Sequence, residues 1–466
     1  MENSLVLKES TYKDLKEHLY PGNNLEFAAI MLCHYGQGKT SFRLIVKEVI
    51  TIPSDKCNEQ KSNYLSWAFA EYMNPKKIEQ IDKEGLSIVT IHSHPNGYNQ
   101  FSKTDDKNDK EMFHSINHWF DDKRPNGSAI MLPNGEIIAR TFNNTGKFNP
   151  IQKILVIGED IKIWQQSKKK NKIPDYGLKI SQTFGKGTFH ILRGLKVGVV
   201  GCSGTGSIIV ELLMRNCVGQ LVLVDPDVVE AKNLNRIINA KKVDVEEKIY
   251  KVETLKKAIL ETGIDIKIDT YIKDTKSKEV IEALTDCDVI FGCVDSATGR
   301  YHLECIATAY FIPYFDIGVY LEADSKGGII QADVAAHYIH PESSSLITRG
   351  VYTSEQLTSE GWQKDDKDYY EKNKMTGYLK AVGEDQPAVI SVNMQAACLA
   401  FNDFLARLHK FRLDDNSEFT IQKFQLVQGH YFNEKGKGKL SPIFKKYLGM
   451  GEKSFLIQQL KQDEKD

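Results

Sequence analysis

The sequence predicts an α/β protein built from two domains. Near the N-terminus, two apolar runs within residues 25–50 flank a turn, which predicts a β-hairpin. Farther on, an apolar run at residues 197–200 meets a glycine-containing turn, a helical segment and a second apolar run at 221–224. This strand–turn–helix–strand order is typical of a mostly parallel sheet. A chain of 466 residues has room for both units.

The composition is ordinary for a globular protein, with 41% hydrophobic and 26% charged residues. A net charge of -1 provides no basic field for binding nucleic acid. No apolar run approaches the roughly 18 residues that span a membrane, and residues 1–10 do not have the pattern of a signal peptide. The 8 cysteines form no CxxC pair, so we expect free, mostly buried thiols and a cytoplasmic location.

The first candidate site follows an expected strand at residues 87–91. His92 and His94 continue this strand and, because side chains alternate, face the same side. Ser102 and Asp105 follow near the start of a helix. Two histidines and one carboxylate make an open zinc site whose remaining position holds water. Zinc lowers the pKa of that water, and Glu26, at the start of an earlier strand, is the candidate base.

Ser102 is the candidate hydrogen-bond donor to a developing oxyanion. The alternative, two surface histidines near a turn, does not account for the coincidence of these spaced polar residues. The spacing HxHP-x6-SxxD, with a glutamate upstream, is that of the JAMM motif, and residues 1–150 resemble JAB/MPN-domain metalloproteases. The resemblance implies that Glu26 is the base, that His92, His94 and Asp105 bind zinc, and that the substrate is a peptide or isopeptide bond after a ubiquitin-like protein.

We place this domain at residues 1–160 and a linker at 161–177, where a basic run is broken by Pro174. The second domain, at 178–466, opens with the glycine loop. Its glycines let the backbone approach phosphates at a helix N-terminus, and the acid after the second strand meets a ribose hydroxyl. The residues in these roles are Gly201, Gly204, Gly206 and Asp225. Because Ser203 interrupts the GxGxxG pattern, the loop alone is a weak signal.

The residues after the second strand favour ATP over a nicotinamide cofactor. Arg236 can neutralise phosphate charge, Asn233 can fix the loop through hydrogen bonds, and Lys251 on the next helix can reach the same phosphates. Asp295 lies past the carboxyl end of the strand expected at 289–292, where a carboxylate can hold Mg2+. A dehydrogenase would need neither Arg236 nor Lys251.

The segments GCSGTGS, DPDVVEAKNLNR and CVDSATGR resemble the ThiF/MoeB/HesA superfamily, which includes the activating enzymes of ubiquitin-like proteins. The resemblance implies a Rossmann-like domain that uses ATP and Mg2+ to adenylate the C-terminal carboxylate of a protein, and a homodimer. The nucleotide-binding residues that it implies are Gly201, Gly204, Gly206, Asp225, Asp227, Asn233, Arg236, Lys251 and Asp295, with Lys248 as a second candidate for the phosphate lysine.

Three departures from the superfamily concern an arginine and two sets of cysteines. Ser181 stands where an arginine usually reaches the partner's ATP, so Lys186 or Arg193 would have to replace it. Ser345 and Thr348 stand where zinc-binding cysteines are expected, so we expect no structural zinc in this half. The crossover segment, at about 340–386, contains no cysteine, and we expect Cys398 to lie in the core.

The acyl acceptor therefore has two interpretations. Either the domain only adenylates, or a hydroxyl forms an oxyester, with Ser345 as the selected nucleophile. The hydroxyl candidates are Ser343, Ser344, Ser345, Thr348, Ser354 and Thr376.

We therefore predict a bacterial-type bifunctional protein, in which a zinc isopeptidase processes a modifier that the second domain activates. The expected partners are a ubiquitin-like β-grasp protein and a relative of conjugating enzymes. Antiviral defence is a possible setting by analogy with bacterial ubiquitin-like operons. One alternative is processing and adenylation of a sulfur carrier for biosynthesis. Another is a protease joined to a non-catalytic binding scaffold.

Overall fold

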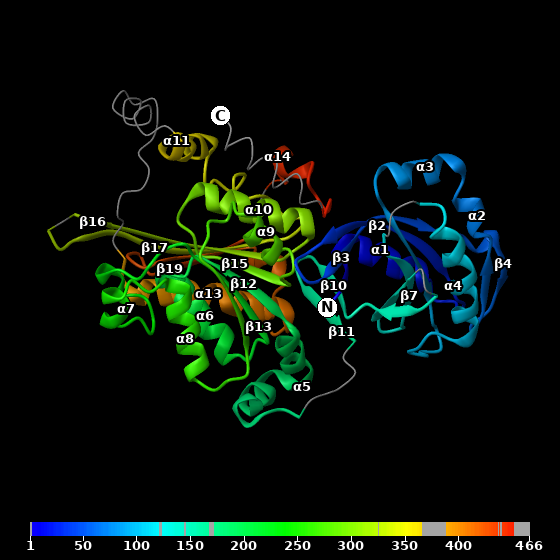
Figure 1. Cartoon of the computed structure of the whole chain (residues 1–466), viewed down its shortest axis with the longest axis horizontal. Coiled ribbons are helices and arrows are strands. Elements are labelled where there is room, and N and C mark those ends of the chain that lie inside the picture. Colours follow the sequence, from blue (N-terminus) through cyan, green and yellow to red (C-terminus); the bar gives the residue numbers. More distant parts are fainter. Residues whose placement is uncertain are drawn as a thin grey trace. The chain divides into compact units, whose positions relative to one another are not determined.

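The computed structural model describes residues 2–120, 124–143, 146–166, 172–324, 326–365, 388–436, 438 and 440–451. The chain forms two compact units (Figure 1), the first mainly from Met1–Lys170 and the second mainly from Asn171–Thr308 and Ile312–Leu448. The α/β class and the mostly parallel sheet predicted for the second unit are confirmed.

The first unit is built on a nine-stranded sheet with the order β11-β10-β1-β3-β2-β6-β7-β8-β9. Its strands are β1 (Ser4–Lys8), β2 (Ala28–Gln37), β3 (Phe42–Thr51), β6 (Ser87–Ser93), β7 (Asn126–Met131), β8 (Ile137–Phe142), β9 (Phe148–Pro150), β10 (Lys153–Ile157) and β11 (Ile161–Gln165). A separate hairpin pairs β4 (Cys57–Gln60) with β5 (Leu65–Trp67), and the helices are α1 (Glu9–Leu19), α2 (Phe69–Tyr72), α3 (Pro75–Lys83) and α4 (Lys103–Ile116).

Both faces of this sheet are buried, which explains why β2 is an almost continuous apolar run. Alternate β2 residues enter two separate cores. Ala29 and Met31 pack on the face covered by α1, and Ile30 and Leu32 pack on the face covered by α3 and α4. The helix that carries Asp105 is thus held against the sheet that carries the two histidines.

The predicted linker begins too early. Residues 161–165 form β11, which pairs antiparallel with β10 and extends the sheet of the first unit. The side chains of Ile161 and Ile163 are buried there, so the alternating apolar residues at the end of this domain run into the segment that was assigned to the linker. Residues 167–171 of the predicted linker lie outside the described residues.

The second unit contains an eight-stranded sheet with the order β14-β13-β12-β15-β16-β17-β18-β19. Its strands are β12 (Lys196–Val200), β13 (Gln220–Val224), β14 (Lys267–Tyr271), β15 (Val289–Gly292), β16 (Tyr314–Ala323), β17 (Ile329–Ile339), β18 (Ile421–Gln425) and β19 (His430–Glu434). Its helices are α5 (Leu178–Gly194), α6 (Gly204–Arg215), α7 (Lys242–Glu246), α8 (Lys251–Glu261), α9 (Lys278–Leu284), α10 (Ala297–Tyr310), α11 (Ser354–Asp365), α13 (Ile390–Leu408) and α14 (Pro442–Lys445).

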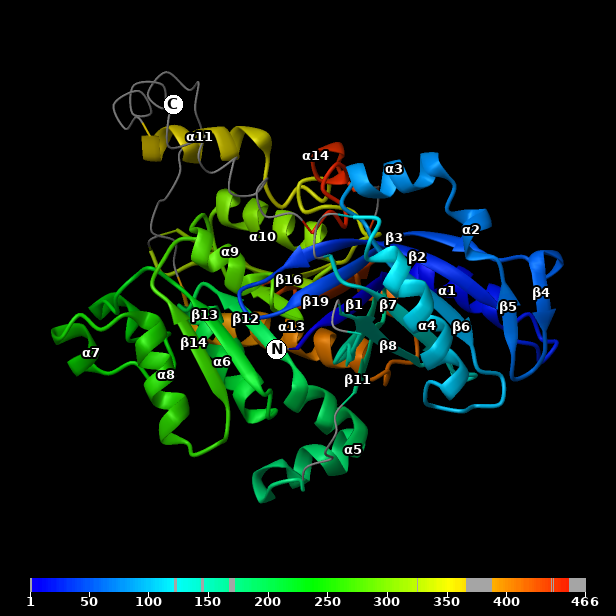
Figure 2. The same ribbon diagram turned by 45° about the vertical axis from the view of Figure 1, so that its right-hand side comes forward.

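The strands from β14 to β16 are parallel and follow the doubly wound order 3-2-1-4-5. Their register aligns Val200 with Val224 and with Gly292, so the carboxyl ends of β12, β13 and β15 meet at one edge of the sheet. Ligands of such sheets bind at this edge. Helices α6 and α13 pack side by side in this unit (Figure 2). Among the described helices, none is long and apolar enough to cross a membrane.

The turn from β12 into α6 requires glycine. Gly201 has φ +86, and a Cβ on Gly206 would lie 1.8 Å from the carbonyl oxygen of Gly201. A Cβ on Gly201 would likewise lie 2.5 Å from the carbonyl oxygen of Cys293. Both contacts involve backbone atoms, which cannot move without disturbing the fold. The turn therefore closes only because these two side chains are absent.

We predict that Gly206→Ala lowers the free energy of unfolding by about 1–3 kcal/mol, because the added methyl group overpacks the turn. Gly187→Ala is the matched control. It lies in α5 with nothing within 4 Å of its would-be Cβ, and alanine should change stability there by no more than about 1 kcal/mol, in the stabilising direction. Thermal unfolding followed by circular dichroism compares the two variants. Equal melting temperatures would contradict the steric argument.

Candidate metal and nucleotide sites

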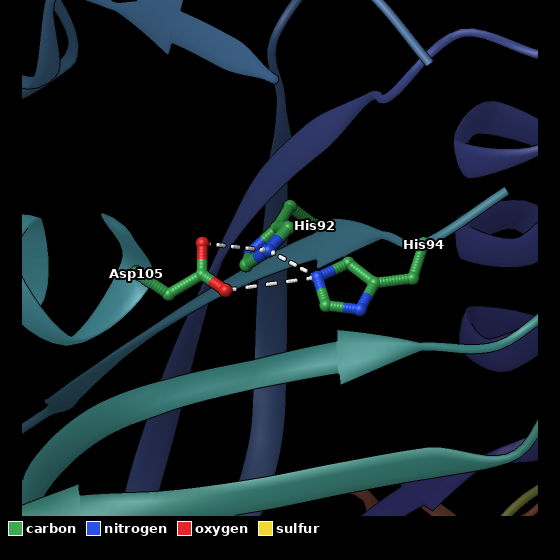
Figure 3. Close-up of side chains that lie close together, drawn as sticks. All are labelled: His92, His94 and Asp105. Carbon is green, nitrogen blue, oxygen red and sulfur yellow. Dashed lines mark hydrogen bonds and ion pairs between the residues drawn. The ribbon is translucent and has the colours of Figure 1, made fainter. Parts of the chain in front are cut away.

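The predicted metal ligands lie together at the end of β6 and the start of α4 (Figure 3). His92 Nε2 lies 3.0 Å from His94 Nε2, and the Asp105 carboxylate is 3.5 Å from the first nitrogen and 3.8 Å from the second. One ligand atom from each residue lies within 4.8 Å of the others. Two imidazole nitrogens and one carboxylate oxygen at these separations suit a small divalent cation such as Zn2+.

Hydrogen bonds outside the cluster orient two of these ligands. His94 Nδ1 lies 2.7 Å from the carbonyl oxygen of Tyr98, so this nitrogen carries the proton and leaves Nε2 free to bind metal. Asp105 is the third residue of α4 and forms a capping box with Ser102. The Ser102 N–H donates to Asp105 Oδ2 at 2.6 Å, and the Asp105 N–H donates to Ser102 Oγ at 3.1 Å. The start of α4 thus fixes the carboxylate toward the histidines.

The charges at this cluster are strongly coupled. Burial raises the pKa of Asp105, but hydrogen bonding and attraction to His92 outweigh burial, so the net pKa lies below its usual range. Burial lowers the pKa of His92, and Asp105 more than compensates, so the net pKa is raised. Burial and the neighbouring His92 lower the pKa of His94. These shifts describe an anionic carboxylate beside the two imidazoles.

Glu26 lies beside the metal cluster. It precedes β2, whose first residue Ala28 pairs with His92, and it is 6% exposed. Burial raises the pKa of the Glu26 carboxyl to about 7, with His92 opposing the shift and Asp105 adding to it. The Ser102 hydroxyl accepts the cap hydrogen bond from Asp105 and so retains its own proton for donation.

One groove of about 560 Å³ joins Glu26, Ser102 and all three predicted ligands. Beyond the metal cluster, polar residues such as Asn63 and Asn108 line part of the groove, and another part is apolar and aromatic, with contributions from Leu65, Trp67, Phe69, Met112 and Trp119. The rings of Phe69 and Trp119 stack at 6.0 Å. The residues that line the groove include four carboxylates and neither lysine nor arginine. An extended peptide with apolar side chains and no acidic residues fits this lining.

Sequence reasoning missed Arg140, which anchors α4. This arginine on β8 pairs with Asp109 at 2.7 Å and donates to Asp106, both on α4. The guanidinium lies between the rings of Phe101 and Phe148, 3.7 Å from each centroid. Its two carboxylate partners are more than thirty positions away in the chain, so no local motif marks it. Arg140 therefore helps to hold the helix that carries Asp105.

In the second unit, Asp225 and Asp227 follow β13 and surround Lys251. Lys251 Nζ lies 2.7 Å from Asp227 Oδ2 and 3.6 Å from Asp225 Oδ1. Asp225 also accepts hydrogen bonds from the N–H groups of Cys202 at 2.7 Å and of Asp227 at 2.9 Å. Burial raises the Asp225 pKa, while Lys251 and the two N–H groups oppose that shift. The network joins the glycine loop to the first residue of α8.

The two candidates for the phosphate-binding lysine, Lys251 and Lys248, differ in burial and position. Lys251 is 7% exposed at the carboxyl edge of the sheet, beside the predicted ribose acid. Lys248 lies in the exposed turn before α8, with φ 52. Of the two candidates for the phosphate lysine, Lys251 is thus the one that lies near the predicted ribose acid.

The loop after Asp227 is fixed as the sequence pattern indicated. Asn233 is 3% exposed, and its Oδ1 accepts the N–H of Glu230 at 3.0 Å. Arg236 donates to the carbonyl of Lys232 at 2.6 Å and packs its aliphatic part against Gly204. Its cationic side chain thus lies near the N-terminus of α6.

Asp295 is exposed after β15, at the same edge of the sheet as Asp225. Arg300 has the structural role expected from the sequence, because its Nε pairs with the fully buried Asp316 at 3.1 Å.

Arg193, one proposed replacement for the missing arginine, is paired with Asp265 at 2.9 Å. Ser181, by contrast, is only partly buried on α5.

The structure argues against Ser345 as the acyl acceptor. Ser345 is 0% exposed, and its hydroxyl pairs with Thr348 Oγ1 at 2.6 Å, so an acyl group cannot reach it in this fold. Ser343 and Ser344 are buried as well, whereas Thr348 and Ser354 are exposed. Residues 366–386 of the crossover segment, including Thr376, lie outside the described residues.

Cys398 is exposed rather than in the core. The buried face of α13 runs through Ala396, Ala397 and Ala400, and Cys398 falls on the opposite side of the helix. Partial burial raises the pKa of its thiol, so a thiolate is not favoured there.

Comparison with known proteins identifies both units. Residues 176–416 match the model of the ThiF family, and residues 8–141 match the model of prokaryotic homologs of the JAB domain. The fold and the sites thus define an adenylating enzyme joined to a JAB domain. Because the ThiF match covers more than half of the residues, the chain belongs to the ThiF family.

The solved structures that the chain matches include MccB of E. coli and PaaA. MccB with ATP is 15% identical, with a TM-score of 0.42 over 59% of this chain and 75% of that chain. MccB with MccA-N7isoASN is also 15% identical, with a TM-score of 0.44 over 58% and 74%. PaaA is 17% identical, with a TM-score of 0.40 over 58% and 85%. No curated protein matches the sequence. These likenesses are distant, and the family assignment rests on the sequence match alone.

We predict that Ser102→Ala lowers the free energy of unfolding by about 1 kcal/mol, because α4 loses the side-chain acceptor for its Asp105 N–H. Asparagine caps helices about as well as serine, so Ser102→Asn should restore most of the loss. Chemical unfolding of both variants measures the difference. Equal stability of the alanine variant and the wild type would show that the capping box contributes little.

Proposed function

We propose that this protein activates the C-terminus of a ubiquitin-like protein with ATP and, in its first unit, cleaves bonds that follow the same C-terminus. The observation that carries the proposal is the gathering of Glu26, His92, His94 and Asp105 in one groove of a chain whose other half belongs to the ThiF family. A hydrolytic centre and an adenylating fold in one protein suit a shared protein substrate.

The donor set of the first unit fits zinc. His92, His94 and Asp105 would hold the ion, because their three ligand atoms converge and His94 already directs Nε2 toward the others. When bound, zinc supplies Lewis acidity and makes water a stronger nucleophile at neutral pH. Magnesium in the second unit would be held by Asp295, whose exposed carboxylate is a suitable hard oxygen ligand.

The protein groups of the first unit have separate tasks in cleavage. Glu26 accepts a proton from water at the floor of the groove and returns it to the leaving amine. The Ser102 hydroxyl donates to the oxygen of the scissile carbonyl as negative charge develops there. The aromatic wall formed by Trp67, Phe69 and Trp119 binds the adjoining peptide and excludes water from one side.

In the second unit, ATP and a C-terminal carboxylate are the two substrates. A carboxylate oxygen attacks the α-phosphorus of ATP, the bond to pyrophosphate breaks, and an acyl-adenylate forms. Arg236 and Lys251 balance the charge of the phosphates, and Lys251 must exchange its contact with Asp227 for one with the nucleotide. Asp225 retains lone pairs for the ribose hydroxyls, since each of its oxygens accepts one backbone N–H.

The acyl-adenylate is passed to an acceptor outside this chain. Residues 318–397 contain no cysteine, and Ser345 is buried. An oxyester on exposed Thr348 or Ser354 is the alternative that the fold allows. The missing cysteine also favours a second candidate function, in which the adenylated protein is a sulfur carrier and an external sulfur donor attacks it. The protein is expected to act as a homodimer.

His92→Ala should abolish stoichiometric zinc binding and lower cleavage of a ubiquitin-like protein with a C-terminal extension by at least about 100-fold, because one of three protein ligands is lost. His114→Ala, which changes an exposed histidine on α4, is the matched control. Metal analysis of the purified protein and gel-based cleavage assays provide the two measurements. Undiminished zinc content in the His92 variant would contradict the ligand assignment.

Asp295→Asn should remove the advantage of Mg2+ in ATP binding, because an amide is a weaker magnesium ligand than a carboxylate. Titration calorimetry with ATP, in the presence of either Mg2+ or EDTA, measures this advantage without the modifier. Asp414→Asn removes the same charge from an exposed position and should behave like the wild type. If the Asp295 variant retains the full effect of Mg2+, another group holds the cation.

A further inference from the structure

A buried asparagine on α13 lies against the glycine loop. Asn393 is 6% exposed, and its Nδ2 lies 2.0 Å from the position that a Cβ on Gly204 would occupy. Gly204 is the first residue of α6, and the side chain of Arg236 approaches the same point to 3.2 Å. The amide reaches the start of α6 only because residue 204 has no side chain.

Helix packing alone does not explain this amide. The buried face of α13 is otherwise mainly apolar near this position, with Val392, Ala396, Ala397 and Ala400 packed in the unit. Among the described residues, the Asn393 side chain has no hydrogen-bond partner, although its backbone N–H donates to Val389. The Asn393 amide is not one of the fully sealed, unpartnered polar groups among the described residues, so a ligand can reach it. A side chain that is only 6% exposed normally uses its amide in a hydrogen bond, and a ligand at the start of α6 would provide one.

The surroundings of the amide favour an anionic ligand. The first N–H groups of α6 have no partners within the helix, and the helix dipole places partial positive charge at this end. No side chain caps α6 at Ser203 in the described structure, so these N–H groups remain available. Arg236 adds a full positive charge beside them. The Asn393 amide adds a neutral donor at the same end.

We propose that Asn393 is a phosphate-binding residue of the activating domain, and that its Nδ2 donates a hydrogen bond to a phosphate oxygen of ATP bound at the start of α6. This inference rests on the proposed use of ATP by this unit. It adds to the nucleotide site a residue about 190 positions downstream of the glycine loop. The C-terminal carboxylate of the protein substrate has similar chemistry, so the experiment must separate it from the phosphates.

The test compares charge at two positions of one helix. Asn393→Asp keeps the shape of the side chain but replaces the donor with a negative charge, and Asn402→Asp places the same charge at an exposed position on α13. Binding of ATP with Mg2+ is measured by titration calorimetry in the full chain without any protein substrate, so the substrate carboxylate cannot contribute. Adenosine is titrated in parallel, because it lacks phosphates.

We expect Asn393→Asp to weaken ATP binding by more than about tenfold, as for the loss of a hydrogen bond to a charged group, while adenosine binding stays unchanged. Asn402→Asp should match the wild type with both compounds. Asn393→Ala, which removes the donor without adding charge, should weaken ATP by a smaller factor. If the aspartate variant fails to fold, ATP binding by the alanine variant still tests the role of the Asn393 amide.

Two results would overturn the inference alone. One is ATP binding by both Asn393 variants within twofold of the wild type. The other is an equal loss of ATP and adenosine affinity, which would indicate a packing role. Failure of the wild-type protein to bind ATP would instead overturn the proposed function, and the inference would fall with it.

Discussion

The unsatisfied N–H groups at the first turn of a helix govern both candidate sites. Each site lies where a helix begins after a strand, α4 in the first unit and α6 in the second. Such N–H groups must find an acceptor from the protein, the solvent or a ligand. In α4, Ser102 and Asp105 satisfy two donors reciprocally, and the same carboxylate turns its other oxygen toward His92. In α6, Ser203 provides no side-chain cap, so acceptors must come from elsewhere.

This difference decides what each helix start can bind. At the capped start of α4, side chains already satisfy backbone N–H donors. The cap also fixes the position of the Asp105 carboxylate, the candidate metal ligand. An uncapped start, closed tightly by Gly201 and Gly206, keeps free N–H donors and partial positive charge, which is the arrangement that suits an anionic group. Lys251 lies nearby and forms ion pairs with Asp225 and Asp227. These two ion pairs hold the Lys251 side chain at the carboxyl edge of the sheet.

Sequence reasoning found the residues whose partners are close in the chain. The spacing from His92 to Asp105 and the pattern from Asp225 to Arg236 each lie within a single strand–helix connection, so alternation and loop chemistry predict their side of the sheet. Arg140 and Asn393 were missed because the groups that they approach, Asp109 for Arg140 and Gly204 for Asn393, lie on distant elements. Cys398 was misplaced for another reason. Its helix was predicted, but the apolar residues surrounding it did not define the phase of the buried face.

For Ser345, the sequence comparison predicted which residue lies beside it but not what its hydroxyl does. The sequence pattern puts Ser345 and Thr348 where cysteines would bind structural zinc, and in the structure the two hydroxyls do lie together, 2.6 Å apart. Glu304 fixes the following segment, because it accepts the N–H of Leu346 at 2.9 Å and the hydroxyl of Tyr352 at 3.0 Å. Hydrogen bonds thus stabilise this loop in place of the structural zinc that cysteines at these positions would bind. Of the two hydroxyls, that of Ser345 is buried, and this burial argues against Ser345 as the acyl acceptor.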